Sequence, residues 1–139
     1  MNRFHVHVSV RDLERSVAFY SALFGQAPQK RREGYARWLL DDPRLNFAIS
    51  ASQSRSGVDH LGMQVDSVAE LDQLTGALRS AGEAVDDERN ATCCYAKSDK
   101  GWVRDPQGLS WETFVTHADA TTYGQDGPHA AARAGCCAG

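Results

Sequence analysis

The feature that most restricts the fold of this chain is an order of elements that occurs twice. Residues 4–10 alternate apolar and polar side chains, as a half-buried strand does, and a helical pattern begins at Asp12. Residues 58–65 alternate in the same way, and a second helical pattern follows Ser67. Short strand patterns come after each helix. The sequence therefore predicts one βαβββ module written twice.

Two such modules predict an α+β fold within a single domain of residues 1–117. The modules cover about residues 3–51 and 58–117. Each has a sheet with one face to bury and one helix to cover it, so we expect the sheets to form an open barrel whose inner faces line a cleft. The strands expected after the helices are 29–33, 35–40, 45–50, 84–89, 93–98, 101–104 and 109–116. Residues 118–139 are small and polar and should form a flexible tail.

Two histidines occupy equivalent positions in the two modules. His5 precedes Asp12 by seven residues, and His60 precedes Ser67 by the same seven. Both lie on the polar face of their strands, opposite the apolar stripe. The pseudo-twofold relation of the modules should bring the two side chains together in the cleft. A lone histidine on a strand usually has a structural role, whereas two in register across a repeat favour a ligand role.

Glu112 is a charged residue in the middle of the last hydrophobic strand pattern. Burying a carboxylate without a partner is costly, so we expect a metal ion or an arginine beside it. Its counterpart in the first module is Ala48, which has no ligand atom. His5, His60 and Glu112 are therefore the predicted metal ligands and catalytic residues. Two histidines and one carboxylate with open positions suit Fe(II) and oxygen activation, whereas a set of four ligands would favour Zn2+ or Ni2+ as a Lewis acid.

His7 competes with His5 for the role of first ligand, because it lies on the same strand face two residues further on. Register with His60 favours His5, and His7 would then match Gly62. In that position His7 would support a ligand or contact the substrate. Whether His7 replaces or supports His5 stays open.

Cys93 and Cys94 offer two soft sulfur donors side by side. Such a pair suits trivalent arsenic, cadmium, mercury or copper(I). It suits a disulfide poorly, because the ring that joins adjacent cysteines is strained. The alternative interpretation is two small apolar residues buried on a strand. Since successive residues of a strand point to opposite faces, chelation by both thiols requires a bulge or mobile loop at residues 89–92; otherwise one thiol binds at rest.

Aromatic residues near these candidates could form the walls of the site, and Tyr95 directly follows the two cysteines as a candidate substrate contact. The others are Trp102, Trp111 and Phe47, for which a place in the core is the simpler interpretation. The second cysteine pair, Cys136 and Cys137, lies in the predicted tail, with an accessory or incidental role.

Composition excludes several classes of function. A net charge of −3 with scattered basic residues predicts no nucleic-acid partner. The sequence has neither an apolar run that could span a membrane nor a signal peptide. Adjacent cysteine pairs differ from the spaced cysteines of secreted domains, so we expect a cytoplasmic protein. Whether it is a monomer or a homodimer stays open.

These residues resemble a known superfamily. The two βαβββ modules, the run from His5 to Tyr20, and the turn Asp105-Pro106-Gln107-Gly108 before Glu112 are similar to the vicinal-oxygen-chelate proteins. These include glyoxalase I, bleomycin-resistance proteins and extradiol dioxygenases. The resemblance covers about residues 3–116. It implies the fold with two modules, and it leaves the function open.

A sharper resemblance lies in Thr92-Cys93-Cys94-Tyr95-Ala96, with Gly34-Tyr35-Ala36, Asp41-Asp42-Pro43 and Asp59-His60-Leu61-Gly62 upstream. It is similar to the organoarsenical carbon–arsenic lyases and cadmium-induced proteins, the ArsI/CadI-type group. The resemblance implies an Fe(II)-dependent dioxygenase that demethylates trivalent methylarsenicals and strips arsenic from trivalent aromatic arsenicals. It implies metal ligands at His5, His60 and Glu112 and arsenic-binding thiols at Cys93 and Cys94. Some members of the group have glutamine where this chain has His5.

The expected reaction uses an organoarsenical such as methylarsonous acid together with dioxygen. The thiolates of Cys93 and Cys94 would hold As(III) beside Fe(II), and the carbon–arsenic bond would be cleaved to give arsenite. Two alternatives stay open. A cadmium- or arsenic-binding resistance protein needs the cysteines but not His5, His60 and Glu112, and a glyoxalase-type lyase needs the fold but not the cysteines.

Overall fold

The computed structural model describes residues 1–93 and 96–119, and of Cys93 and Asp119 only the backbone. Predictions for the thiol of Cys93, for Cys94 and Tyr95, and for the tail from residue 120 onward with Cys136 and Cys137 therefore lie outside the described residues. The described elements are β1 (Arg3–Val10), α1 (Leu13–Phe24), β2 (Lys30–Arg32), β3 (Tyr35–Asp41), β4 (Arg44–Ala51), β5 (Gly57–Gln64), α2 (Val68–Ser80), β6 (Asp86–Cys93), β7 (Ala96–Arg104) and β8 (Ser110–Asp119).

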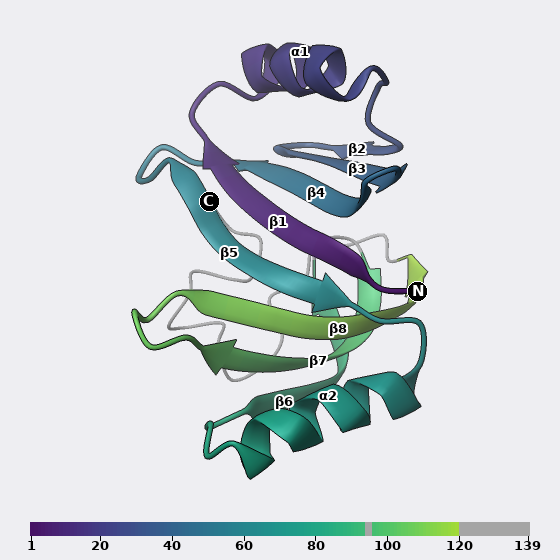
Figure 1. Cartoon of the computed structure of the whole chain (residues 1–139). Coiled ribbons are helices and arrows are strands. Elements are labelled where there is room, and N and C mark those ends of the chain that lie inside the picture. The colour runs from purple at the N-terminus through teal and green to yellow at the C-terminus, as the bar shows by residue number, and fades with distance from the viewer. Residues whose placement is uncertain (94–95, 120–139) are drawn as a thin grey trace.

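All eight strands of the described residues form one sheet in the order β2-β3-β4-β1-β5-β8-β7-β6. The two first strands of the modules, β1 and β5, lie side by side at its centre, and β2 and β6 form its open edges (Figure 1). Helix α1 covers the half of the sheet built by the first module, and α2 covers the other half (Figure 1). The predicted pair of βαβββ modules is confirmed, and the sheet does not close into a barrel.

The strand register shows the pseudo-twofold relation directly. β1 and β5 run antiparallel, with His5 opposite Gly62 and His7 opposite His60. A twofold rotation that exchanges the modules carries the first of these pairs onto the second. The outer pairings follow the same rule, because β1 runs parallel to β4 and β5 runs parallel to β8. The two modules therefore meet where the histidines stand.

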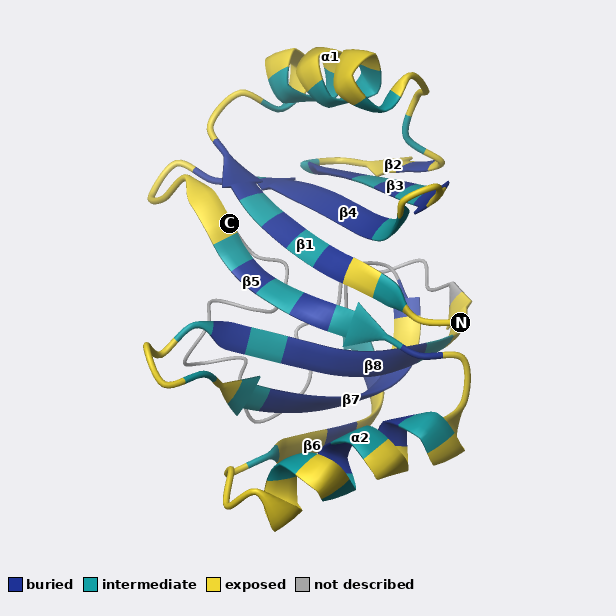
Figure 2. Cartoon of the chain, viewed as in Figure 1, coloured by how far each residue is buried: buried dark blue, intermediate teal, exposed yellow. Residues whose placement is uncertain are grey.

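The apolar stripes of the strands pack under the helices. In the first module the core lies between α1 and the sheet, where the Tyr20 ring is 4.5 Å from that of Phe47 and both lie near Trp38. In the second module Leu71 of α2 packs against Val65 and other apolar residues. Figure 2 shows buried residues along the strands and exposed residues on the outward faces of both helices.

The opposite face of β1 is polar and still buried. His5, His7 and Ser9 are 5%, 1% and 2% exposed, respectively. Polar groups at this depth need hydrogen-bond partners or a ligand. The face of β1 that carries His5, His7 and Ser9 is therefore both polar and buried.

Both helices begin where the sequence predicts. The Asp12 carboxylate accepts a hydrogen bond from the Arg15 N–H at 3.0 Å, and α1 ends at Gly25, whose φ of 70° suits glycine. Ser67 caps α2 through the Glu70 N–H. Of the described residues, neither helix is long and apolar enough to span a membrane.

The last three strands differ from the sequence prediction. The candidates at 93–98 and 101–104 are one strand, β7, which is paired over its whole length with β8. β6 continues to Cys93 instead of ending near residue 89, and β8 continues to Asp119, beyond the expected domain boundary. The pairing of β7 on both sides keeps it extended through Lys100 and Gly101, where the sequence alone indicated a break.

Candidate functional site

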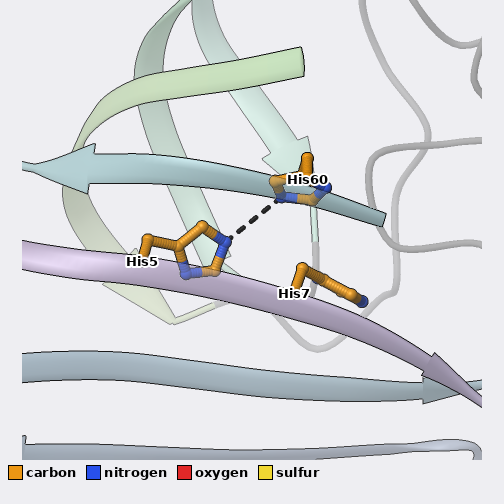
Figure 3. Close-up of side chains that lie close together, drawn as sticks. All are labelled: His5, His7 and His60. Carbon is orange, nitrogen blue, oxygen red and sulfur yellow. Dashed lines mark hydrogen bonds between the residues drawn. The ribbon is translucent and has the colours of Figure 1, made fainter. Parts of the chain in front are cut away.

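Three histidine side chains meet at the centre of the sheet. His5 and His7 come from β1 and His60 comes from β5, and the three present ligand atoms that lie within 4.8 Å of one another (Figure 3). His60 is fully buried. The pseudo-twofold relation of the modules thus brings His5 and His60 together, with their Nε2 atoms 3.2 Å apart.

The hydrogen bonds of the two rings fix which nitrogen faces inward. His5 Nδ1 lies 3.0 Å from the Asn46 carbonyl oxygen, and His60 Nδ1 lies 2.8 Å from Asp59 Oδ2. A carbonyl or a carboxylate can only accept, so both Nδ1 atoms carry hydrogen and donate. This leaves the Nε2 atoms directed at the interior. A histidine whose other nitrogen is held by a carbonyl or carboxylate is the usual form of a metal ligand.

Glu112 completes the set from β8. Its Oε2 atom lies 3.0 Å from His60 Nε2 and 3.5 Å from His5 Nε2, and the residue is 5% exposed. Ligands about 2.1 Å from a divalent ion lie about 3.0–3.4 Å apart when they are neighbours in octahedral or tetrahedral geometry. The three separations, from 3.0 to 3.5 Å, match this spacing. The spacing of the donor set therefore fits a divalent metal ion.

Electrostatics support the same conclusion. Burial alone would lower the pKa of His60, but hydrogen bonds to Asp59 and Glu112 outweigh burial and raise that pKa. Burial lowers the pKa of His5 to about 4, against the pull of Glu112. When His60 is protonated in the metal-free protein, its Nε2 proton lies between the acceptor atoms of His5 and Glu112. A cation bound by all three would replace that proton.

Glu112 also has a partner that the sequence did not reveal. Lys100 on β7 is 3% exposed, and its Nζ lies 2.6 Å from Glu112 Oε1. Burial would raise the pKa of Glu112, but the Lys100 charge and His60 hold it well below its usual value. The sequence prediction called for a metal or an arginine beside this carboxylate, and the structure places a lysine there. The sequence signal for Lys100 was a lysine within an otherwise buried strand. The sequence could not show that this strand, β7, pairs with the strand that carries Glu112.

His7 lies beside His5, His60 and Glu112, but it does not take part in the short contacts among these three. Its Nε2 lies 2.8 Å from Ser50 Oγ, and its ring centroid is 4.9 Å from that of His60. Burial, with smaller contributions from His60 and His5, lowers the pKa of His7 well below its ordinary value. Its strand neighbour on β4 is Ala48. The position that would mirror Glu112 therefore offers no ligand atom.

A small pocket of about 40 Å³ is lined by two of the three candidate ligands, His5 and Glu112. Its lining residues are His5, His7, Tyr35, Arg37, Asn46, Ala96, Ser98, Lys100, Glu112, Phe114 and Thr116. Two buried polar atoms in its wall, Arg37 Nε and Asn46 Oδ1, have no hydrogen-bond partner among the described residues. One is a donor and the other an acceptor, so a polar ligand or water in the pocket can satisfy both.

The predicted aromatic walls are placed differently. The Trp102 ring packs edge-on against His60 with centroids 5.1 Å apart, and Phe114, which the sequence did not single out, packs against His5 at 5.2 Å. Phe47 belongs to the core under α1. Trp111 lies near Phe4. Of the three described candidates, Trp102 alone contacts a site histidine.

The strand that carries Cys93 contains a bulge within residues 89–92, which is one of the alternatives that the sequence left open. Between the pairs Glu88 to Lys100 and Ala91 to Ser98, β6 has two residues where β7 has only Asp99. Asn90 adopts a φ of 53°, and its N–H donates to Asp99 Oδ1 at 2.7 Å. This extra residue puts position 93 opposite Ala96, which lines the pocket.

Two modules in one sheet, with buried histidines where they meet, define a protein of the glyoxalase and extradiol dioxygenase type. The model of the Glyoxalase/Bleomycin resistance protein/Dioxygenase superfamily matches residues 3–113, and the chain belongs to this family. Among solved structures, the 2,3-dioxygenase LapB from Pseudomonas sp. KL28 has a TM-score of 0.66 at 20% identity, covering 91% of this chain and 44% of LapB.

Relatives by sequence narrow the group. A trivalent organoarsenical cleaving enzyme from Thermomonospora curvata is 39% identical, covering 88% of this chain and 82% of that protein. Another such enzyme, from Bacillus sp. strain MD1, is 44% identical, and the match covers 81% of this chain and 71% of that protein. The cadmium-induced protein CadI of Mycobacterium bovis is 36% identical, covering 93% and 86%, respectively. The predicted likeness to both groups is confirmed.

Proposed function

We propose that this protein is a cytoplasmic Fe(II)-dependent dioxygenase that cleaves the carbon–arsenic bond of trivalent organoarsenicals to release arsenite. The observation that carries the proposal is the convergence of His5 Nε2, His60 Nε2 and Glu112 Oε2 at 3.0–3.5 Å from one another. Two histidines and a carboxylate with open positions are the donor set of non-haem Fe(II) oxygenases. The relatives named as organoarsenical cleaving enzymes support the choice of substrate.

In this proposal His5, His60 and Glu112 hold the metal ion, which supplies the binding and activation of dioxygen. The remaining steps belong to the chain. Asn46 and Asp59 keep the two imidazoles in the tautomer that presents Nε2. Trp102 packs against the His60 ring and Phe114 against the His5 ring, and these contacts would hold the two imidazoles in place. His7 is a proposed contact for the substrate or for a ligand.

The proposed arsenic ligands are the thiolates of Cys93 and Cys94, with Tyr95 beside them. Trivalent arsenic is soft and binds thiolate, and its capture there would orient the carbon–arsenic bond. Support comes from the backbone of the β6–β7 pair. Position 93 stands opposite Ala96, which shares the pocket with Glu112. Position 93 is therefore the strand neighbour of a residue that borders the pocket.

The overall reaction balances with dioxygen as the one oxidant. Methylarsonous acid, CH3As(OH)2, and O2 give As(OH)3 and formaldehyde. The carbon–arsenic bond breaks, one oxygen atom goes to arsenic and the other to carbon. The methyl carbon supplies the four electrons that dioxygen takes up, while arsenic stays trivalent. No external reductant is needed.

The test is arsenic speciation after the reduced protein, loaded anaerobically with Fe(II), is mixed with methylarsonous acid in air. Wild type should form arsenite, and Glu112→Ala and Cys93→Ser should each lose this activity. Glu33→Ala, at an exposed residue, is the matched control and should keep it. Wild type that returns methylarsonous acid unchanged would overturn the proposal.

A second candidate is a cadmium- or arsenic-binding protein without catalysis, which the CadI relatives favour. The same experiment separates the two. A binding protein would retain methylarsenic in a thiol-dependent complex, lost in Cys93→Ser and kept in Glu112→Ala. A lyase requires both residues.

A further inference from the structure

Lys100 occupies an unusual place for a lysine. It lies on β7, is 3% exposed, and its Nζ is 2.6 Å from Glu112 Oε1. A buried ammonium is costly unless it is paired and hydrogen-bonded. Replacement of both partners of such a pair by apolar residues is often neutral or favourable for stability, so this ion pair calls for a role beyond stability.

The two oxygens of Glu112 have different surroundings. Oε1 accepts from Lys100, whereas Oε2 faces His60 Nε2 at 3.0 Å and His5 Nε2 at 3.5 Å. A carboxylate can bind a metal ion through one oxygen or through both. With Oε1 held by the ammonium, Oε2 alone is directed at the position where the three ligand atoms converge.

We propose that Lys100 is a positioning residue that keeps Glu112 a ligand through one oxygen, so that the adjacent coordination position stays open for substrate or dioxygen. The inference rests on the proposed function only in that His5, His60 and Glu112 bind a metal ion. It does not depend on the identity of the substrate or on the thiols.

The surroundings of Lys100 hold it in this role. Its Nζ lies 5.8 Å from the centre of the Trp102 ring, and Trp102 in turn packs against His60. Its register partner on β6 is Glu88, itself 7% exposed. β7 is paired on both sides at this point, so the lysine backbone cannot withdraw from the site.

Removal of the ammonium should have two consequences. Glu112 Oε1 would be free to rotate onto the ion and occupy the open position. The positive charge that opposes cation binding would also be gone, and in the metal-free state Glu112 would lack its partner. Both effects make the metal more tightly and more fully coordinated.

The test uses Co(II), whose visible absorption reports coordination number. Lys100→Met should bind Co(II) at pH 8 about tenfold more tightly than wild type and with a changed visible spectrum, an effect of the size that groups behind metal ligands produce. Lys100→Arg retains the charge and a donor and should keep the wild-type spectrum. Lys97→Met, at an exposed lysine on the same strand, is the control and should match wild type in both.

Infrared difference spectra of the Zn(II)-loaded wild type do not need the Lys100→Met variant, and therefore stand even if that variant does not fold. The carboxylate bands of Glu112, assigned by their loss in Glu112→Gln, should show the wide splitting of a ligand bound through one oxygen. Narrow splitting, or a folded Lys100→Met with unchanged Co(II) spectrum and affinity, overturns the role of Lys100. Wild type that binds neither ion at His5 and His60 overturns the metal site itself, and the role of Lys100 with it.

Discussion

The backbone of Gly62 lies so close to Glu112 that a Cβ atom at position 62 would stand 2.3 Å from the Glu112 carbonyl oxygen. The same Cβ would lie 3.2 Å from His5 Cδ2. Gly62 is the register partner of both His5 and Glu112, on the two sides of β5. The missing side chain is what allows β8 to bring Glu112 within reach of the histidines.

Gly62→Ala should therefore cost stability and metal binding together. The added methyl must displace backbone, and overpacking of this kind costs about 1–3 kcal/mol. We expect a lower urea midpoint with an unchanged m-value, and weaker binding of Co(II) in calorimetry.

Gly76→Ala is the matched control for this change. Position 76 lies within α2, and a Cβ there meets nothing within 4 Å. Alanine in a helix is favoured over glycine by about 1 kcal/mol, so this variant should be more stable and bind metal as wild type does. A Gly62→Ala protein with wild-type stability and metal affinity would contradict the close approach.

Asp59 should control metal affinity without touching the ion. Its Oδ2 accepts from His60 Nδ1 at 2.8 Å, and its Oδ1 lies 3.0 Å from Arg55 Nη1. Loss of a carboxylate behind a metal-bound histidine lowers affinity about 10- to 100-fold. Asp59→Asn should show this loss in Co(II) titrations, and Asp72→Asn, at an exposed ion pair, should not. Equal affinities in the two variants would exclude a ligand role for His60 Nε2.

The sequence predicted the fold and part of the site because the spacing of apolar and polar residues indicates strands, helices and their faces. The repeat of the two modules determined the fold, and the equal spacing of His5 and His60 from their helix caps predicted that these two residues meet. Lys100, Asn46 and Phe114 enter the site through strand pairings between segments far apart in the chain. Alternation tells which face a side chain takes, but it does not tell which strand lies beside it. The predicted ligand role of Glu112 stays a prediction, although its position agrees with it.

The metal-free protein should lose stability as the pH falls below 6.5. The pKa of His5 is about 4 in the folded state, against 6.5 when unfolded, because burial disfavours the charged ring. The unfolded chain thus binds more protons between these values, and stability falls as pH decreases through that window, by up to about 3 kcal/mol for this residue. His7 acts in the same direction.

His60 acts in the opposite direction and in another window. Its raised pKa gives stability that is fully present below pH 6.5 and is lost as the pH rises through the folded value. Urea unfolding from pH 4.5 to 8 in the presence of a chelator would measure both pH dependences, the loss of stability toward acid and the loss toward higher pH. His5→Gln should make the loss of stability below pH 6.5 less steep, with the contribution of His7 remaining. A loss of the same slope in His5→Gln would show that His5 is not the buried neutral group.

The bulge at Asn90 should decide whether the proposed arsenic-binding thiol of Cys93 is in register with the pocket. In a regular ladder that continued from Glu88, Thr92 instead of Cys93 would stand opposite Ala96. Asn90→Val places a β-branched residue at a φ of 53°. A left-handed conformation costs about 1–2 kcal/mol for such residues, so the population with Cys93 in register should fall about 5- to 30-fold. Asn90→Gly tolerates the conformation and should keep the register.

Deletion of Asn90 is the control variant that separates the bulge from the register, because it removes the bulge and still leaves Cys93 opposite Ala96. The measurement is titration of metal-free, reduced protein with phenylarsine oxide, in a Cys136→Ser/Cys137→Ser background so that the other thiol pair is absent. Asn90→Val should bind weakly, while Asn90→Gly and the deletion should bind like the parent. If all three bound equally well, the register at Cys93 would not govern capture of arsenic. If the deletion lost binding along with Asn90→Val, the bulge itself would be required, and not the register that it sets.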